Sequence, residues 1–185
     1  MNFEYRLSGL GWADGFIEVN LQRHSFTISY LNDGLGDFLY ALMELNSKCV
    51  PNDEVKSQTT CIWYAEPAGT KLEFNRTDEW LNIKVTSYED IDLNINAKIE
   101  MDTSVLYDEL LFIVIKEVDL LLKTHGIVGY RETWYEHDFP LSTFLKLKGY
   151  LISKNKYSIT SFQEMGWELQ KSELKEDINL LFKDL

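Results

Sequence analysis

The chain has 185 residues, enough for one domain of ordinary size or two small ones. With 45% hydrophobic and 26% charged residues, it has the composition of a folded globular protein, which excludes disorder over the whole chain. Only 18 basic residues stand against 30 acidic ones. The net charge of −12 argues against sequence-independent binding to nucleic acid or to anionic membrane surfaces, because both are negatively charged.

No targeting or membrane-spanning segment is expected. The first residues carry charges of both signs and lead into no apolar stretch, so we expect no secretory signal. The longest charge-free stretches, 24–32 and 57–65, have nine residues each, whereas a membrane-spanning helix needs about 20. Cys49 and Cys61 match neither a disulfide framework nor a metal-binding spacing. We therefore expect two reduced thiols in a cytoplasmic protein.

Alternating apolar and polar residues predict strands over most of the first hundred residues. The clearest short segments are 3–7, 17–21, 26–30, 59–64, 72–74 and 81–85. A turn at 22–24 would place His24 at an exposed hairpin end.

The most regular alternation in the chain runs from Ile91 to Met101. It predicts one long strand with a charged, solvated face and a buried face. The buried side chains would be Ile91, Leu93, Ile95, Ile99 and Met101.

Helical spacing predicts the remaining elements. A helix capped by Asn32-Asp33 should end near Asn46, and another should begin near Pro140. After Met101 the period changes to 3.6, which predicts a long helix over 104–125, capped by 102–104 and ended by Gly126. The segment 161–164 matches a capping box, and apolar residues from 174 to 182 predict a last helix.

This order of elements predicts an α+β fold, since strands come first and helices later without a βαβ alternation. We expect an antiparallel β-sheet of about six to seven strands and three to four helices, with the long helix 104–125 on one face of the sheet. No linker divides the chain, so residues 1–185 should form one domain, strand-rich over 1–101 and helical over 102–185. The acidity is uneven: residues 1–139 hold 24 acidic and 11 basic residues (−13), and 140–185 hold 6 and 7 (+1).

Motifs for common chemistry are missing from the sequence. The glycines at 9–15 and 34–36 lack the spacing and the strand-to-helix context of a dinucleotide-binding loop. Neither cysteine lies in the context of a nucleophile, and there is no Gly-x-Ser-x-Gly elbow. We assign no catalytic residue and expect no cofactor.

One cluster of titratable residues resembles a metal or acid–base site. It contains His125, Glu132, Glu136, His137 and Asp138. The sequence has no His-x-x-x-His or His-Glu-x-x-His spacing, and a metal would need further ligands from elsewhere. We therefore expect no bound metal.

The segment 130–139 is the most unusual, because this connection between two predicted helices carries four aromatic residues. One interpretation is that Trp134 and Phe139 anchor the connection to the core. The other is a recognition loop, since Trp, Tyr and Arg dominate binding hot spots. The candidate binding residues are Tyr130, Arg131, Trp134, Tyr135, Glu136 and His137.

Several segments resemble a set of uncharacterised small bacterial α+β proteins. The likeness covers about residues 20–150 and rests on the runs 29–42, 63–67, 72–74, 129–134, 139–141 and 145–148. It implies a similar packing pattern and assigns a role to no residue. Some small acidic α+β proteins of this kind resemble immunity proteins of bacterial toxin systems.

These observations favour a non-enzymatic protein-binding protein of the bacterial cytoplasm. Its most concrete form is an immunity-type inhibitor that captures a basic protein partner through an acidic surface. Two alternatives stay open. One is a small-ligand-binding protein or hydrolase with a pocket between sheet and helices, using Glu136 and His137. The other is an adaptor that associates with itself.

Overall fold

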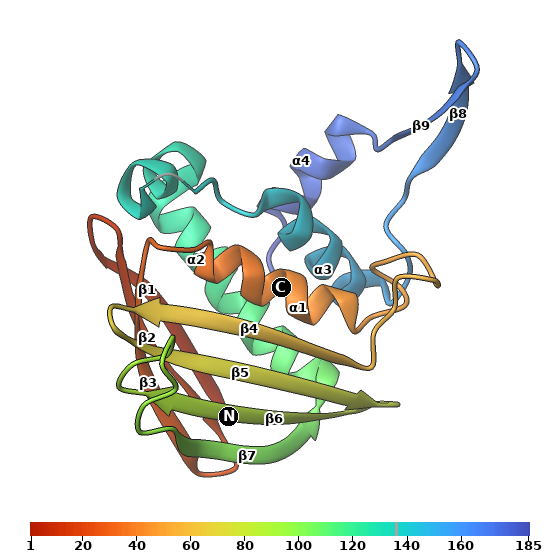
Figure 1. Cartoon of the computed structure of the whole chain (residues 1–185). Helices are drawn as coiled ribbons and strands as arrows, with labels where there is room; N and C mark the ends of the chain where they lie inside the picture. The colour runs from red at the N-terminus through yellow and green to blue at the C-terminus, as the bar shows by residue number, and fades with distance from the viewer. Residues whose placement is uncertain (136) are drawn as a thin grey trace.

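The computed structural model describes residues 1–135 and 137–185 as nine strands and four helices (Figure 1). The strands are β1 (Asn2–Gly9), β2 (Trp12–Val19), β3 (Gln22–Ser29), β4 (Gln58–Ala65), β5 (Ala68–Thr77), β6 (Trp80–Tyr88), β7 (Lys98–Leu106), β8 (Thr160–Glu164) and β9 (Trp167–Lys171). The helices are α1 (Gly34–Glu44), α2 (Tyr107–Trp134), α3 (Leu141–Ser153) and α4 (Leu174–Phe182).

The predicted α+β class with antiparallel strands is confirmed, but the prediction of one sheet of six to seven strands is wrong. The strands form separate sheets in the orders β1-β2-β3, β4-β5-β6-β7 and β8-β9. Between β3 and β4 the chain passes through α1, and the two larger sheets meet through side chains. Phe26 of β3 and Trp63 of β4 lie with ring centroids 4.3 Å apart at this junction. Packed rings here take the place of a backbone hydrogen-bond ladder.

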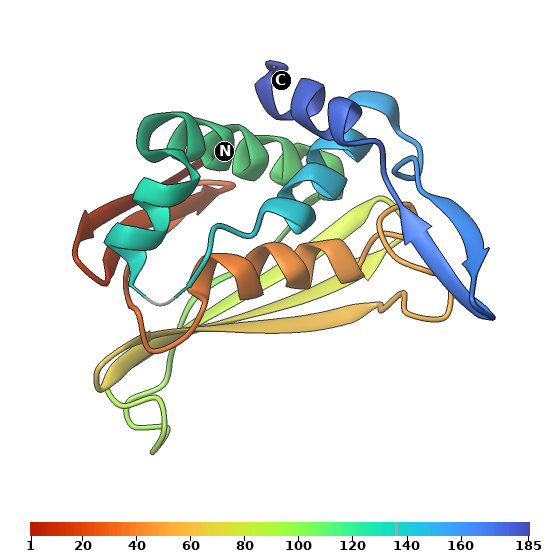
Figure 2. The ribbon, with the colours of Figure 1, turned by 90° about the horizontal axis from the view of Figure 1, so that it is seen from above.

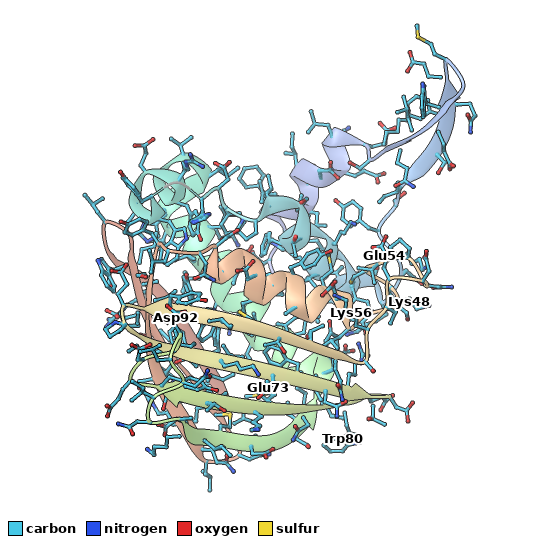
Figure 3. The ribbon with its side chains drawn as sticks, in the orientation of Figure 1. Lys48, Glu54, Lys56, Glu73, Trp80 and Asp92 are labelled. Atoms are coloured by element: carbon cyan, nitrogen blue, oxygen red, sulfur yellow. The ribbon has the colours of Figure 1, made fainter. Side chains whose placement is uncertain are left out.

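The helices pack on one side of the two larger sheets and on one another (Figure 2). α1 contacts β4, α2 contacts β1, α3 contacts both α1 and α2, and α4 contacts α3. A single cluster of buried hydrophobic residues draws on both larger sheets and on α1, α2 and α3. The opposite face of the β4–β7 sheet is polar. There Glu73, labelled in Figure 3, forms ion pairs with Lys71 and Lys84.

The long helix differs from its predicted range of 104–125. Residues 102–104, predicted as its cap, belong to β7 and pair with Asn82, Ile83 and Lys84 of β6. Gly126 adopts φ 68° and produces a kink, after which the chain resumes a helical course to Trp134. Glycine tolerates this positive φ, so the helix bends at Gly126 and does not end there. The second helical piece buries Tyr130 and Trp134, which explains why the helix continues.

The prediction of a continuous strand over 91–101 is also wrong. Asn94 and Asn96 have positive φ, and the Leu93 amide donates to the Asp90 carboxylate, so this stretch is a series of turns. The strand starts only at Lys98. Ile91 and Met101 are buried as predicted, whereas Leu93, Ile95 and Ile99 are exposed.

Helix predictions with a local cap signal agree better with the structure. α1 begins after Asp33, whose carboxylate accepts from the Gly36 amide at 3.0 Å, and α3 follows Pro140. The capping box predicted at 161–164 is instead strand β8. Met165 and Gly166 both have positive φ and form the tight turn into β9, which a two-residue hairpin requires.

His24 is buried in β3, not exposed in a turn as predicted. The turn before β3 falls at Asn20 and Leu21, which have positive φ. An imidazole nitrogen of His24 lies 3.0 Å from the Thr70 hydroxyl of β5, so the residue links the two larger sheets. Burial lowers the pKa of His24 below its usual value.

Replacing Met101 by Ala should destabilise the fold by about 2–5 kcal/mol, because a buried side chain would leave a cavity. Ile99→Ala, two residues away in the same strand, should cost less than about 0.5 kcal/mol, since Ile99 is exposed. Urea denaturation of both variants measures the difference. Equal losses would contradict the assigned start and register of β7.

The lowered pKa of His24 predicts a pH dependence of stability. Neutral, buried His24 contributes its full stabilisation of the folded state above about pH 6.5, the pKa of histidine in the unfolded chain. This stabilisation is lost as the pH falls through the lower pKa of the folded state, because the unfolded chain binds the proton more readily. Unfolding free energies of wild type and His24→Gln between pH 7.5 and 5, roughly the range in which histidine titrates, should show a flatter profile for the variant. A His24→Gln profile as steep as that of the wild type would contradict the prediction.

Candidate functional site

Two of the predicted binding residues lie in the core. Tyr130 and Trp134 are fully buried in α2. The ring centroids of Trp134 and Tyr5 lie 6.4 Å apart, and those of Tyr130 and Phe139 lie 5.4 Å apart. This is the anchoring arrangement that the sequence offered as the alternative for Trp134 and Phe139. In this arrangement Tyr130 and Trp134 are covered by protein and present no surface to a partner.

Three other predicted residues lie at the surface. Arg131 forms an ion pair with Asp138 at 3.5 Å. Tyr135 is half exposed and makes an edge-to-face contact with Tyr30 at 5.2 Å. A ring nitrogen of His137 lies 3.1 Å from the Tyr30 carbonyl oxygen. Glu136 falls outside the described residues.

The chain leads from these residues into a groove between α3 and α4, which we call the α3–α4 groove. Its volume is about 610 Å³. The apolar part of its wall is formed by Phe139, Leu141, Leu145, Leu174, Ile178 and Leu181. Three carboxylates, Asp33, Asp138 and Asp177, also line it, and among the described residues no lysine or arginine does. The groove is therefore an apolar surface with negatively charged groups around it.

Each of the three carboxylates is positioned by a different part of the fold. Asp33 caps α1, and its burial raises its pKa above the usual value. Asp138 is largely exposed beside Arg131. Asp177 accepts hydrogen bonds at 2.7 Å from the hydroxyls of Tyr157 and Ser172. Asp138 is thus the carboxylate with the weakest structural role and the freest access to a ligand.

A smaller cavity of about 170 Å³ adjoins the groove and shares Ser142, Leu145 and Asp177 with it. Tyr157 and Ile159 add further apolar surface to its wall. The apolar surface along α3 therefore continues toward the start of β8.

The position of α4, and with it one wall of the groove, depends on a buried lysine. Lys148 of α3 is fully buried, and its Nζ lies 2.5 Å from a carboxylate oxygen of Asp119 in α2. It also donates to the Leu181 carbonyl of α4 at 3.2 Å. The ammonium group of Lys123 forms ion pairs with Asp119 at 2.7 Å and with Asp184 at 2.6 Å. These bonds hold α4 in place although none of its side chains is fully buried.

The cysteines are not activated as nucleophiles. Cys49 and Cys61 are free and buried; burial raises the pKa of Cys49 to about 12 and that of Cys61 well above its usual value, so both remain thiols. Across the described ranges 1–135 and 137–185, no group of three or more His, Cys, Asp or Glu residues could hold a metal ion.

No protein-family model matches the chain, and neither a curated protein nor a solved structure matches it significantly. In the part of the chain that the structure describes, none of the helices is long and apolar enough to cross a membrane.

The sequence contained a signal for this groove that the search for aromatic hot spots missed. In α4, Leu180 contacts the core, Leu174 and Ile178 lie about a turn apart on the groove side, and Leu181 contacts both the core and the groove. When a short helix has apolar residues on more than one side, packing against the core covers only part of its apolar surface. Two residues of the groove, Asp138 and Phe139, lie at the end of the segment 130–139 that contains the candidate binding residues.

The buried ion pair predicts an asymmetry between its two partners. Asp119→Ala should destabilise the protein by about 3–5 kcal/mol, because it leaves the Lys148 ammonium buried without its counter-charge. Lys148→Met should cost less, since Asp119 keeps Lys123. Denaturation in urea at pH 7 measures the loss of stability in both variants. Equal losses in Lys148→Met and Asp119→Ala would contradict the predicted asymmetry.

Proposed function

We propose that the protein binds another protein, and that it recognises a basic amphipathic segment of that partner in the α3–α4 groove. The observation that carries this proposal is the composition of the groove, whose described lining combines six leucine, isoleucine and phenylalanine side chains with three carboxylates and holds no lysine or arginine. A helix or strand with apolar residues on one side and lysines or arginines on the other complements both parts.

The charge of the whole chain supports the same class of partner. A net charge of −12 speeds the encounter with a basic protein and repels acidic ones. Arg131, Tyr135 and His137 flank the Asp138 end of the groove, and we propose them as additional contacts. Tyr135 is half exposed and offers a rigid aromatic surface to a bound segment.

The most concrete form of this function is an immunity-type inhibitor in the bacterial cytoplasm that neutralises a basic toxin. The two free buried thiols fit such a reducing compartment. A small molecule is the second candidate ligand, because about 610 Å³ lies within the usual volume of small-ligand pockets. The described lining holds no lysine, arginine, asparagine or glutamine side chain, which favours the cationic segment over an anionic metabolite.

The test uses a synthetic amphipathic peptide of leucine and lysine as the probe, with leucines at helical spacing. Isothermal titration at two salt concentrations should give a micromolar Kd that weakens with salt. A peptide with serine in place of leucine, and one with glutamate in place of lysine, should bind at least about tenfold more weakly, because each loses one of the two complementary features.

Variants of the protein locate the bound peptide. Leu141→Ser and Ile178→Ser, on opposite walls of the groove, should each raise the Kd about tenfold, and Asp138→Asn should reduce its salt dependence. The matched controls are Leu93→Ser and Asp92→Asn. Both residues lie in the loop before β7, where Asp92 is labelled in Figure 3 and Leu93 is exposed. If these controls weaken binding as much as the groove variants do, the groove is not the binding site.

A further inference from the structure

A second surface is formed by β8 and β9, which extend from the body of the molecule as a two-stranded hairpin (Figure 1). Every residue of both strands is exposed, and the hairpin extends from the body of the molecule (Figure 3). From its geometry and charge we propose that this hairpin is a dimerisation surface, on which a second copy of the same chain packs its own hairpin.

The hairpin has one apolar and one polar face. Residues paired across an antiparallel ladder share a face, so Phe162 lies beside Leu169, with Trp167 next to them toward the turn. The other face carries Ser161, Gln163, Glu168 and Gln170. Trp167 is 75% exposed, and Met165 in the turn is 94% exposed. An alternation this regular is typical of a hairpin with one face covered by protein.

An isolated two-stranded hairpin is at best marginally stable in water, and a third strand or a packed layer normally supports it. Within the described chain, the main contacts of β8 and β9 are with each other, and at the base of the hairpin Gln170 and Lys171 also line the small cavity beside α3. The apolar face of the β8–β9 hairpin therefore lacks the layer that would stabilise it, and a second hairpin at the usual spacing of about 10 Å between sheets would supply that layer.

The local charge favours a second copy over the basic partner proposed for the groove. Residues 155–172 contain two lysines and two glutamates, so the hairpin region is neutral in a chain of net charge −12. It therefore has no excess charge to attract a basic surface, and two such regions approach each other without the repulsion that the acidic body would produce.

The charges on the apolar face are also complementary under a two-fold rotation. Glu164 lies at the turn end of the face, and Lys171 lies at the opposite end. When two hairpins pack antiparallel, the turn end of one covers the base of the other. Glu164 and Trp167 of one copy then lie at the end that holds Lys171 of the second copy, and both a carboxylate and an indole attract an ammonium group. The same contacts occur twice, as a two-fold interface requires.

The size of the face sets the expected strength. Three apolar side chains and a turn methionine give a patch of a few hundred Å², less than the area of most permanent dimers. We therefore expect a reversible dimer with a Kd in the micromolar range. Sedimentation velocity from roughly 1 µM to roughly 1 mM of the full chain should show a monomer at low and a dimer at high concentration. A monomer over the whole range would overturn the proposal.

Variants on the two faces test the location. Trp167→Ser and Phe162→Ser, on the apolar face, should raise the dimer Kd at least about tenfold. Gln163→Ser and Gln170→Ser, in the same strands on the polar face, should leave it unchanged. All four positions lie outside the core, so circular dichroism should report an unaltered fold. A dimer that persists in Trp167→Ser, or is lost in Gln170→Ser, would show that the contact lies elsewhere.

Charge exchange tests the antiparallel orientation. Glu164→Lys alone and Lys171→Glu alone should each weaken the dimer, because each places like charges at both ends of the interface. An equal mixture of these two variants should dimerise again, since every end then joins a lysine to a glutamate. Failure of the mixture to dimerise would exclude this geometry. The groove lies outside this interface, so peptide binding at the groove is measured separately in the same variants.

Discussion

The fold depends on the burial of Trp63 at the point where the two larger sheets and the first helix meet. Its indole donates to the Gly34 carbonyl at 2.9 Å, and its ring packs on Phe26 of β3 and Phe38 of α1. A Cβ at Gly34 would lie 2.9 Å from Ile28 and 3.3 Å from Trp63, so only glycine allows the start of α1 to approach this closely. One fully buried side chain thus replaces the missing ladder between β3 and β4 and fixes the direction of α1.

The groove follows from that constraint through a chain of contacts. Because the start of α1 is fixed, Asp33 is held in place as the cap of this helix. The same carboxylate also lines the groove. α3 packs on α1 and α2, and Lys148 then fixes α4 to both neighbours through Asp119 and the Leu181 carbonyl. Buried ion pairs add little net stability, but they are sensitive to geometry. This pair therefore sets where α4 lies more than how strongly the fold is held.

Local signals in the sequence predicted what local physics determines. The cap at Asp33, the proline before α3 and the change of period after Met101 identified helices, because each acts within a few residues. The division into separate sheets was not predicted, since pairing between distant strands leaves no trace in a period of two. The alternation over 91–101 failed because Asn94 and Asn96 adopt turn conformations while their neighbours keep a strand-like order. At the site, the aromatic residues of 130–139 were compatible with both a core and a surface position, and the fold places Tyr130 and Trp134 inside.

The separation of charge along the chain acquires a structural meaning from these two surfaces. The α3–α4 groove lies where the acidic part of the chain, through Asp33 and Asp138, meets the nearly neutral C-terminal part. The β8–β9 hairpin lies wholly within the neutral part and projects from the body. An acidic groove selects a basic ligand and disfavours a second acidic copy, whereas a neutral apolar hairpin does the reverse. Under the two proposals, this uneven charge assigns the basic partner and the second copy to different surfaces, so that neither competes with the other.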